Sequence, residues 1–178
     1  MLTIELPQDE SFDQSKGEFV YFDEMTVKME HSLVSLSEWE RHYKKAFLTD
    51  EDKTPEETIY YIKCMALEEI SMRDASRIYR NPKTLKQVFD YINDPACATT
   101  INEKKEKKGR DIITAEILYY DLIALQIPFE VQYWHLNRLL TLIKVCSIKN
   151  EPPKKTSMNE RYSRQKAINE MNRAKFGM

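Results

Sequence analysis

The chain has 178 residues, of which 31% are charged and 42% are hydrophobic, so it can form one domain with appendages and bury a core. It contains only three glycines, which excludes a P-loop and a dinucleotide-binding fingerprint, because both need glycine where the backbone approaches a phosphate. The formal net charge of −2 argues against a general nucleic-acid-binding protein.

The charge is unevenly placed along the chain. Residues 1–30 carry eight acids and two lysines, a net charge of −6, whereas residues 149–178 carry eight bases and three acids, a net charge of +5. Opposite charges at the two ends can attract each other or a neighbouring copy. The alternative is that both ends are simply solvated.

Cysteine usage and hydropathy indicate the compartment. Cys64, Cys97 and Cys146 are far apart and form no CxxC pair, so neither a disulfide framework nor a zinc site is predicted. The N-terminus MLTIELPQDESFD is acidic where a signal peptide is basic, and no uncharged apolar run reaches the roughly 18 residues of a membrane span. We therefore expect a reducing compartment and no membrane.

Residues 1–31 are predicted to be an acidic strand region. LTIEL and EFVYFDEMTVKME mix β-branched and aromatic residues with polar ones, and the segment from Pro7 to Gly17 is rich in turn-forming residues. Two or three short strands, or a hairpin, are expected. The imperfect alternation of FVYF leaves open which face is buried.

Residues 32–150 are predicted to be a helical core domain. SLSEWERHYKKAF begins with Ser35 followed by Glu38, which is the spacing of a capping box. Its apolar residues recur at helical spacing. They are Leu36, Trp39, Tyr43 and Phe47.

Two later helix starts carry proline at the first helical position. TPEETIYYIKCMAL begins with Thr54 as N-cap, then proline and two acids that suit the helix dipole. PKTLKQVFDYIND begins at Pro82 and is ended by Pro95. The segment 71–79 between them is either a short helix or irregular. Residues 95–110 are a charged connector, for which a solvated loop is more ordinary than an anion contact.

The segment from Asp111 to Lys155 is dense in large apolar residues. A helix capped by Asp111 is predicted to run to about Gln126 and to be mostly buried, because it is apolar nearly all round. Pro128 breaks the pattern and suits the first position of a second helix, 128–148. The sequence thus predicts a central helical hairpin at about 111–148.

Residues 151–178 form a basic C-terminal tail. Pro152 and Pro153 end the preceding helix, and Ser157 with Glu160 can begin a last one. The apolar residues of this last helix are sparse, so alone it would be marginal, and either a mobile or a partner-stabilised tail is expected. The predicted fold class is therefore mainly α: a helical bundle with N-terminal strands and a basic C-terminal helix.

The sequence carries no motif of enzyme chemistry. The histidines His31, His42 and His135 have no metal-ligand neighbour at helical spacing, and no HExxH or GxSxG occurs. His135 is more typical of a structural histidine satisfied by a hydrogen bond. We therefore predict a protein that is not an enzyme, with no catalytic residue, cofactor or metal.

Large aromatic and aliphatic residues are the candidates for partner binding. At helical spacing they are more typical of a core than of base stacking, so core and interface remain open for each. The tail arginines could bind an acidic protein surface or nucleic acid. The candidate partner-binding residues are Trp39, Tyr119, Trp134, Leu139, Ile143, Arg161 and Arg164.

From Ser32 to about residue 170 the chain resembles proteins encoded in the tail modules of long-tailed, siphovirus-like bacteriophages, described as tail assembly chaperones. The likeness rests on SLVSLSEWERHYKKAFL, TPEETIYYIKCM and ITAEILYYDLIALQIPFEVQYWHLNRLLTLIKVCSIKNEPPKK. It is densest over 112–155, in PFE, WHLNRLLTLI and the PPKK exit.

The resemblance implies a mainly helical, non-enzymatic protein of the host cytoplasm that is absent from the mature virion. Such chaperones coat the tape measure protein and help to recruit tail tube subunits. An apolar helix pair is compatible with this role because it offers a groove to an amphipathic helix, and the charged ends allow self-association.

Two other classes of protein remain as alternatives. One is a structural tail or connector protein that stays in the virion. The other is a regulator that binds nucleic acid through the basic tail, although the overall charge makes nucleic acid the less expected partner.

Overall fold

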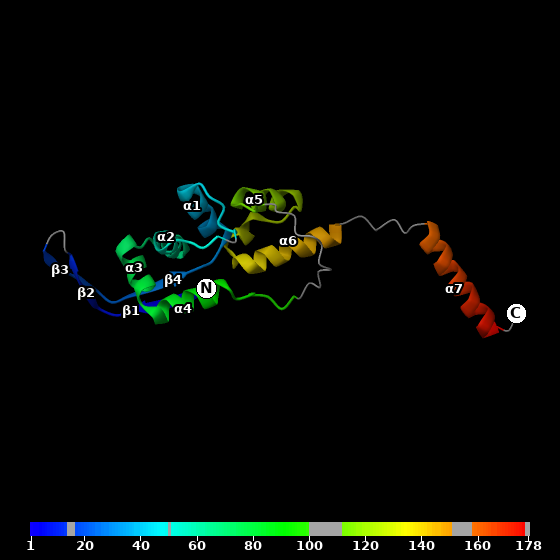
Figure 1. Ribbon diagram of the computed structural model, residues 1–178, viewed down its shortest axis with the longest axis horizontal. Coiled ribbons are helices and arrows are strands. Elements are labelled where there is room, and N and C mark those ends of the chain that lie inside the picture. Colours follow the sequence, from blue (N-terminus) through cyan, green and yellow to red (C-terminus); the bar gives the residue numbers. More distant parts are fainter. Residues whose placement is uncertain (14–16, 50, 100–111, 151–157, 177–178) are drawn as a thin grey trace. The chain divides into compact units, whose positions relative to one another are not determined.

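The computed structural model describes residues 1–13, 17–49, 51–99, 112–150 and 158–176 (Figure 1). The chain is mainly helical with strands at its N-terminus, as the sequence predicts. It divides into two compact units, Met1–Cys146 and Ser147–Met178. The elements in the described part are β1 (Leu2–Leu6), β2 (Asp9–Asp13), β3 (Glu18–Phe22), β4 (Met25–Met29), α1 (Leu33–Tyr43), α2 (Pro55–Met65), α3 (Met72–Arg80), α4 (Pro82–Ile92), α5 (Ala115–Ala124), the 3-10 helix η1 (Phe129–Tyr133), α6 (Leu136–Asn150) and α7 (Met158–Phe176).

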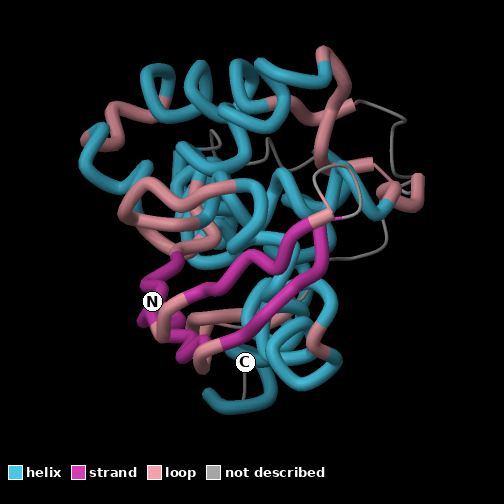
Figure 2. Tube along the Cα trace, turned by 90° about the vertical axis from the view of Figure 1, so that its left-hand side faces the viewer, coloured by secondary structure: helices cyan, strands magenta, loops and turns pink. Residues whose placement is uncertain are grey.

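The four strands form one long antiparallel hairpin, whose two arms run side by side in Figure 2. β1 pairs with β4 and β2 with β3 in a single register, which runs from the pair Leu2 and Met29 to the pair Asp13 and Glu18. The ladder is interrupted after β1 because Pro7 has no N–H to donate. At the base of the hairpin, alternate residues face the core. These are Ile4, Leu6, Val27 and Met29.

The N-cap of helix α1 lies three residues before the predicted one. The prediction of Ser35 as N-cap is wrong, because Ser32 takes that position and Ser35 is the third residue of the helix. The two serines cap each other: the Ser35 N–H donates to Ser32 Oγ at 3.3 Å and the Ser32 N–H donates to Ser35 Oγ at 3.0 Å. Lys44, with φ of 56°, ends the helix. Phe47 therefore lies outside α1, although its ring still packs against Trp39 at 5.1 Å.

Helices α2, α3 and α4 begin where local signals place them. Thr54 caps α2 with proline next and Glu57 completing the capping box, as predicted. The segment left open in the sequence is helical, since Ser71 and Asp74 form a capping box at the start of α3. Asn81 caps α4, whose first residue is proline, also as predicted.

The central hairpin of helices is broken over a longer stretch than predicted. α5 begins at Ala115 rather than near residue 111, and the predicted cap Asp111 lies outside the described residues. The second helix does not begin at Pro128, which instead precedes the short η1; α6 begins only at Leu136. The reason is a distant acceptor: the His31 carbonyl takes the Leu136 N–H at 2.7 Å and fixes the start of α6 there.

Two apolar clusters form the core of the first unit. The first joins the base of the hairpin to α1, α2, α3 and α4, and contains Trp39, Tyr61 and Met65. The second joins α1 to α5, η1 and α6, and contains Leu36 and Leu122. Helix α1 contributes to both, so it links the strand side of the unit to the α5 side.

The second unit contains α7, which confirms a helix in the basic tail. Its described side chains, from Tyr162 to Lys175, are exposed. The predicted cap Ser157 and most of the charged connector, residues 100–110, lie outside the described residues.

Candidate functional site

The residues predicted to bind a partner occupy different environments. Trp39, Leu139 and Ile143 are buried in the two core clusters, and the Trp39 indole N–H donates to the Glu57 carbonyl at 3.0 Å. Tyr119 is half-buried, with its hydroxyl 3.0 Å from Gln132 Oε1. These side chains stabilise the fold and leave little or no surface to a partner.

The remaining predicted residues are exposed or lie on α7. Trp134 is partly exposed, with the Arg138 guanidinium 4.0 Å above its ring. Arg164 is exposed on α7. Arg161 is also in α7, but its side chain lies outside the described part of the chain.

Helix α5 is not mostly buried, and this prediction is wrong. Only one face, which carries Ala115, Leu118 and Leu122, packs into the core. The opposite face carries exposed apolar side chains beside the exposed Glu116, and Tyr120 and Ile123 are 67% and 62% exposed there. An apolar pattern all round a helix predicts burial only when elements are available to cover both sides.

Exposed apolar side chains also lie on η1, which contacts α5 through Tyr119. Phe129 and Tyr133 of η1 are 49% and 64% exposed, and the Phe129 ring lies 6.2 Å from that of Tyr119 on α5. We name this surface the α5–η1 face. It consists of Ile117, Tyr120, Ile123, Phe129 and Tyr133.

The α5–η1 face is held by contacts on its buried side. The two side-chain oxygens of Glu40, a buried residue of α1, accept hydrogen bonds from the backbone of Ala115 and of Phe47, each at 2.7 Å. A carboxylate at the first turn also suits the positive end of the α5 dipole. After α5, the Ile127 N–H donates to the Leu122 carbonyl at 2.8 Å. The face is therefore preformed on a fixed helix.

Glu40 was missed by sequence reasoning because its partners are distant. It lies 75 residues from Ala115 in the chain. The exposed positions of α5 were missed for a related reason, since apolar residues on both faces give no local sign of which face is covered.

The buried histidines have structural partners. His31 Nδ1 lies 2.5 Å from the Tyr61 hydroxyl, and His135 Nε2 lies 2.9 Å from the Tyr91 carbonyl, as expected for a structural His135. Burial, with His135 nearby, lowers the pKa of His31 to about 3. Burial also raises the pKa of Tyr61 above its ordinary value. His31 is therefore neutral at physiological pH and holds the junction of the hairpin, α2 and α6.

Among the described residues, no group of three or more histidines, cysteines or acids is placed to hold a metal ion. The three cysteines are free thiols. Within the same residues, no helix combines the length and the apolar character that a membrane crossing requires.

Comparison of the chain with models of protein families, with curated proteins and with solved structures gave no match.

Proposed function

We propose that the chain is a non-enzymatic tail assembly chaperone of a long-tailed bacteriophage, which binds an amphipathic helical segment of the tape measure protein through the α5–η1 face. The observation that carries the proposal is the exposure of large apolar side chains on a helix whose other face is firmly packed. Exposed apolar patches of this kind mark interaction sites in folded proteins.

The shape of the α5–η1 face suits a helical partner. On α5, Ile117, Tyr120 and Ile123 are spaced three residues apart and lie on one side of the helix. An amphipathic helix binds such a surface with its own apolar stripe. Fully burying an exposed large apolar side chain contributes about 1.5–3 kcal/mol, so several half-exposed side chains favour association appreciably.

The sequence resemblance supports the identity of this partner. The segment most similar to tail assembly chaperones, residues 112–155, contains both α5 and η1. On this proposal the protein acts in the host cytoplasm, keeps the apolar helices of the tape measure protein soluble, assists the recruitment of tail tube subunits and is absent from the mature virion.

Co-expression with the tape measure protein tests the proposal. The unmodified chain should raise the soluble fraction of the tape measure protein and co-purify with it. Tyr120→Glu should abolish both effects because it places a charge in the centre of the face. Gln87→Glu, which adds the same charge at an exposed position of α4, is the matched control and should behave as the unmodified chain does. No co-purification, or equal co-purification of Tyr120→Glu, would contradict the proposal.

Mass spectrometry of purified phage particles distinguishes a chaperone from a structural protein of the virion. The chaperone should be absent from them, whereas a tail or connector protein should be present in stoichiometric amounts. The regulator alternative predicts DNA binding that weakens steeply with salt and with Arg164→Gln. A chaperone should show neither.

A further inference from the structure

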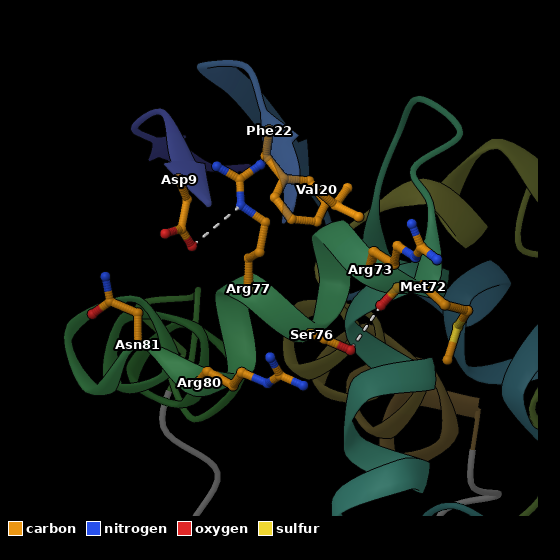
Figure 3. A pocket seen from close by; sticks show the side chains of 9 residues that line it. All are labelled: Asp9, Val20, Phe22, Met72, Arg73, Ser76, Arg77, Arg80 and Asn81. Carbon is orange, nitrogen blue, oxygen red and sulfur yellow. Dashed lines mark hydrogen bonds and ion pairs between the residues drawn. The ribbon is translucent and has the colours of Figure 1, made fainter. Parts of the chain in front are cut away.

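A second surface lies on the strand side of the first unit. A cleft of about 460 Å³ separates helix α3 from the distal half of the hairpin (Figure 3). On α3 it is lined by Arg73, Arg77 and Arg80, which are four and three residues apart and so share one face of the helix. It shares no residue with the α5–η1 face.

Arg77 holds the hairpin against α3. Its guanidinium lies 4.9 Å from the Phe22 ring and 3.4 Å from the Asp74 carboxylate, and it donates to the Pro7 carbonyl. A longer ion pair of 4.0 Å joins it to Asp9, as Figure 3 shows. These contacts hold the Arg77 side chain in place at the base of the cleft, and little of that side chain is exposed.

Arg73 and Arg80 lie about one turn to either side of Arg77 and are exposed. The neighbouring Asn81 accepts the Lys83 N–H through Oδ1, which leaves its NH₂ group able to donate. The lining includes three arginines and the acid Asp9, and Arg77 is paired with both Asp9 and Asp74, so the exposed Arg80 supplies the positive charge that can meet an anion. The cleft therefore presents more hydrogen-bond donors than acceptors and attracts an anion.

The opposite wall of the cleft is apolar. Val20 and Phe22 of β3 face α3, while Phe19 and Tyr21 alternate to the outer surface and are exposed. Met72 extends the apolar wall on the helix side. A ligand that fits this lining has carboxylates for the arginines and an apolar group for the wall.

We propose that this cleft binds a short acidic peptide segment of a partner protein, with an aliphatic side chain against Val20 and Phe22 and a carboxylate on Arg80. A planar guanidinium fork matches a carboxylate in two parallel hydrogen bonds. The cleft volume is in the range of sites that take small ligands or a few residues of a peptide.

The surrounding charge favours a short segment over a nucleic acid. The hairpin beside the cleft carries Glu10, Glu18, Asp23 and Glu24. A polyanion that extended beyond the arginines would be repelled by these acids, whereas a segment confined to the cleft would not.

Fluorescence anisotropy with the full chain and a fluorescein-labelled EDLEDL peptide tests the inference. Binding should saturate at low salt and weaken as salt rises. The uncharged QNLQNL peptide should bind at least about tenfold more weakly, because the charge-assisted hydrogen bonds are lost. Arg80→Gln should weaken EDLEDL binding by about tenfold. Arg80→Lys should recover only part of that loss, since a lysine keeps the charge without the fork.

Lys86→Gln is the matched control, because it removes one exposed positive charge from α4 outside the cleft, and it should leave binding unchanged. Three results would overturn the inference: no saturable binding of EDLEDL at low salt, equal binding of EDLEDL and QNLQNL, or unchanged binding by Arg80→Gln. Tighter binding of a labelled dT12 oligonucleotide would also overturn it in favour of nucleic acid.

Discussion

Helices α2 and α5 are almost equal in length, with 11 and 10 residues, but different contacts fix their first turns. α2 has a complete capping box, and its third residue, Glu57, also pairs with Lys45 at 2.9 Å. α5 has no side-chain cap hydrogen bond and depends on Glu40 of α1. α2 is secured by its own sequence, whereas α5 is secured by a neighbouring helix.

The two helices also differ in what they leave exposed. Tyr61, Ile62 and Met65 of α2 are buried in the first core cluster, and no large apolar residue of α2 is more than partly exposed. α5 buries three residues and exposes three large apolar ones. The difference shows that apolar content does not measure burial: the large apolar residues of α2 are covered within this chain, whereas those on the outer face of α5 stay exposed.

Two adjacent residues of α5 should differ most in how much they contribute to the free energy of unfolding. Leu122→Ala should lower the free energy of unfolding by about 2–5 kcal/mol, because Leu122 is fully buried and a cavity would remain. Ile123→Ala should change it by no more than about 0.5 kcal/mol, because Ile123 is exposed. Urea unfolding followed by circular dichroism measures both. Equal losses would mean that both faces of α5 are buried.

The free energy of unfolding should fall at low pH because of His31, which contacts Tyr61 of the first cluster. Its pKa is about 3 in the folded chain and about 6.5 when unfolded, so the unfolded state binds the additional proton as pH falls. The stability contributed by neutral His31 is complete above pH 6.5 and is lost by about 1.4 kcal/mol per pH unit below it, or about 2 kcal/mol at pH 5.

Urea unfolding between pH 5 and 8 measures this dependence. His31→Gln should be less stable at neutral pH but should flatten the dependence. His42→Gln, which changes an exposed histidine of α1, should keep it because His31 remains. An unchanged slope in His31→Gln would assign the acid sensitivity to another group.

The smallest expected effects concern the two helix caps. Thr54→Ala should cost about 1 kcal/mol, since it removes the acceptor of the Glu57 N–H at 3.2 Å. Thr114→Ala should cost much less, because Thr114 makes no side-chain cap hydrogen bond. Thermal melts of the two variants give the comparison, and a larger loss for Thr114→Ala would reverse the account of how the helices are secured.

Local signals predicted much of the fold. The starts of α2 and α4 were correct because their caps and prolines lie within four residues of one another. The start of α1 was wrong because a second serine, Ser32, completes a capping box with Ser35, and the start of α6 was wrong because a distant group decides it. The His31 carbonyl, which lies 105 positions before Leu136 in the chain, accepts the Leu136 N–H and fixes the start of α6.

The candidate sites were less predictable than the fold. Sequence patterns select large aromatic residues such as Trp39 and Trp134, but exposure depends on which elements pack beside them. Tyr120 and Ile123 look like core residues by spacing alone. Arg77 and Asp9 are 68 positions apart, so the arginine-lined cleft exists only once the hairpin has folded onto α3.

The central claim is that the α5–η1 face is the surface that a partner covers. Hydrogen–deuterium exchange of the full chain, alone and bound to the tape measure protein, tests it most directly because every backbone amide reports on its own region. Exchange should slow on binding in α5 and η1 and stay unchanged in α2. Slower exchange confined to α2, α3 or the hairpin, with α5 and η1 unaffected, would contradict it.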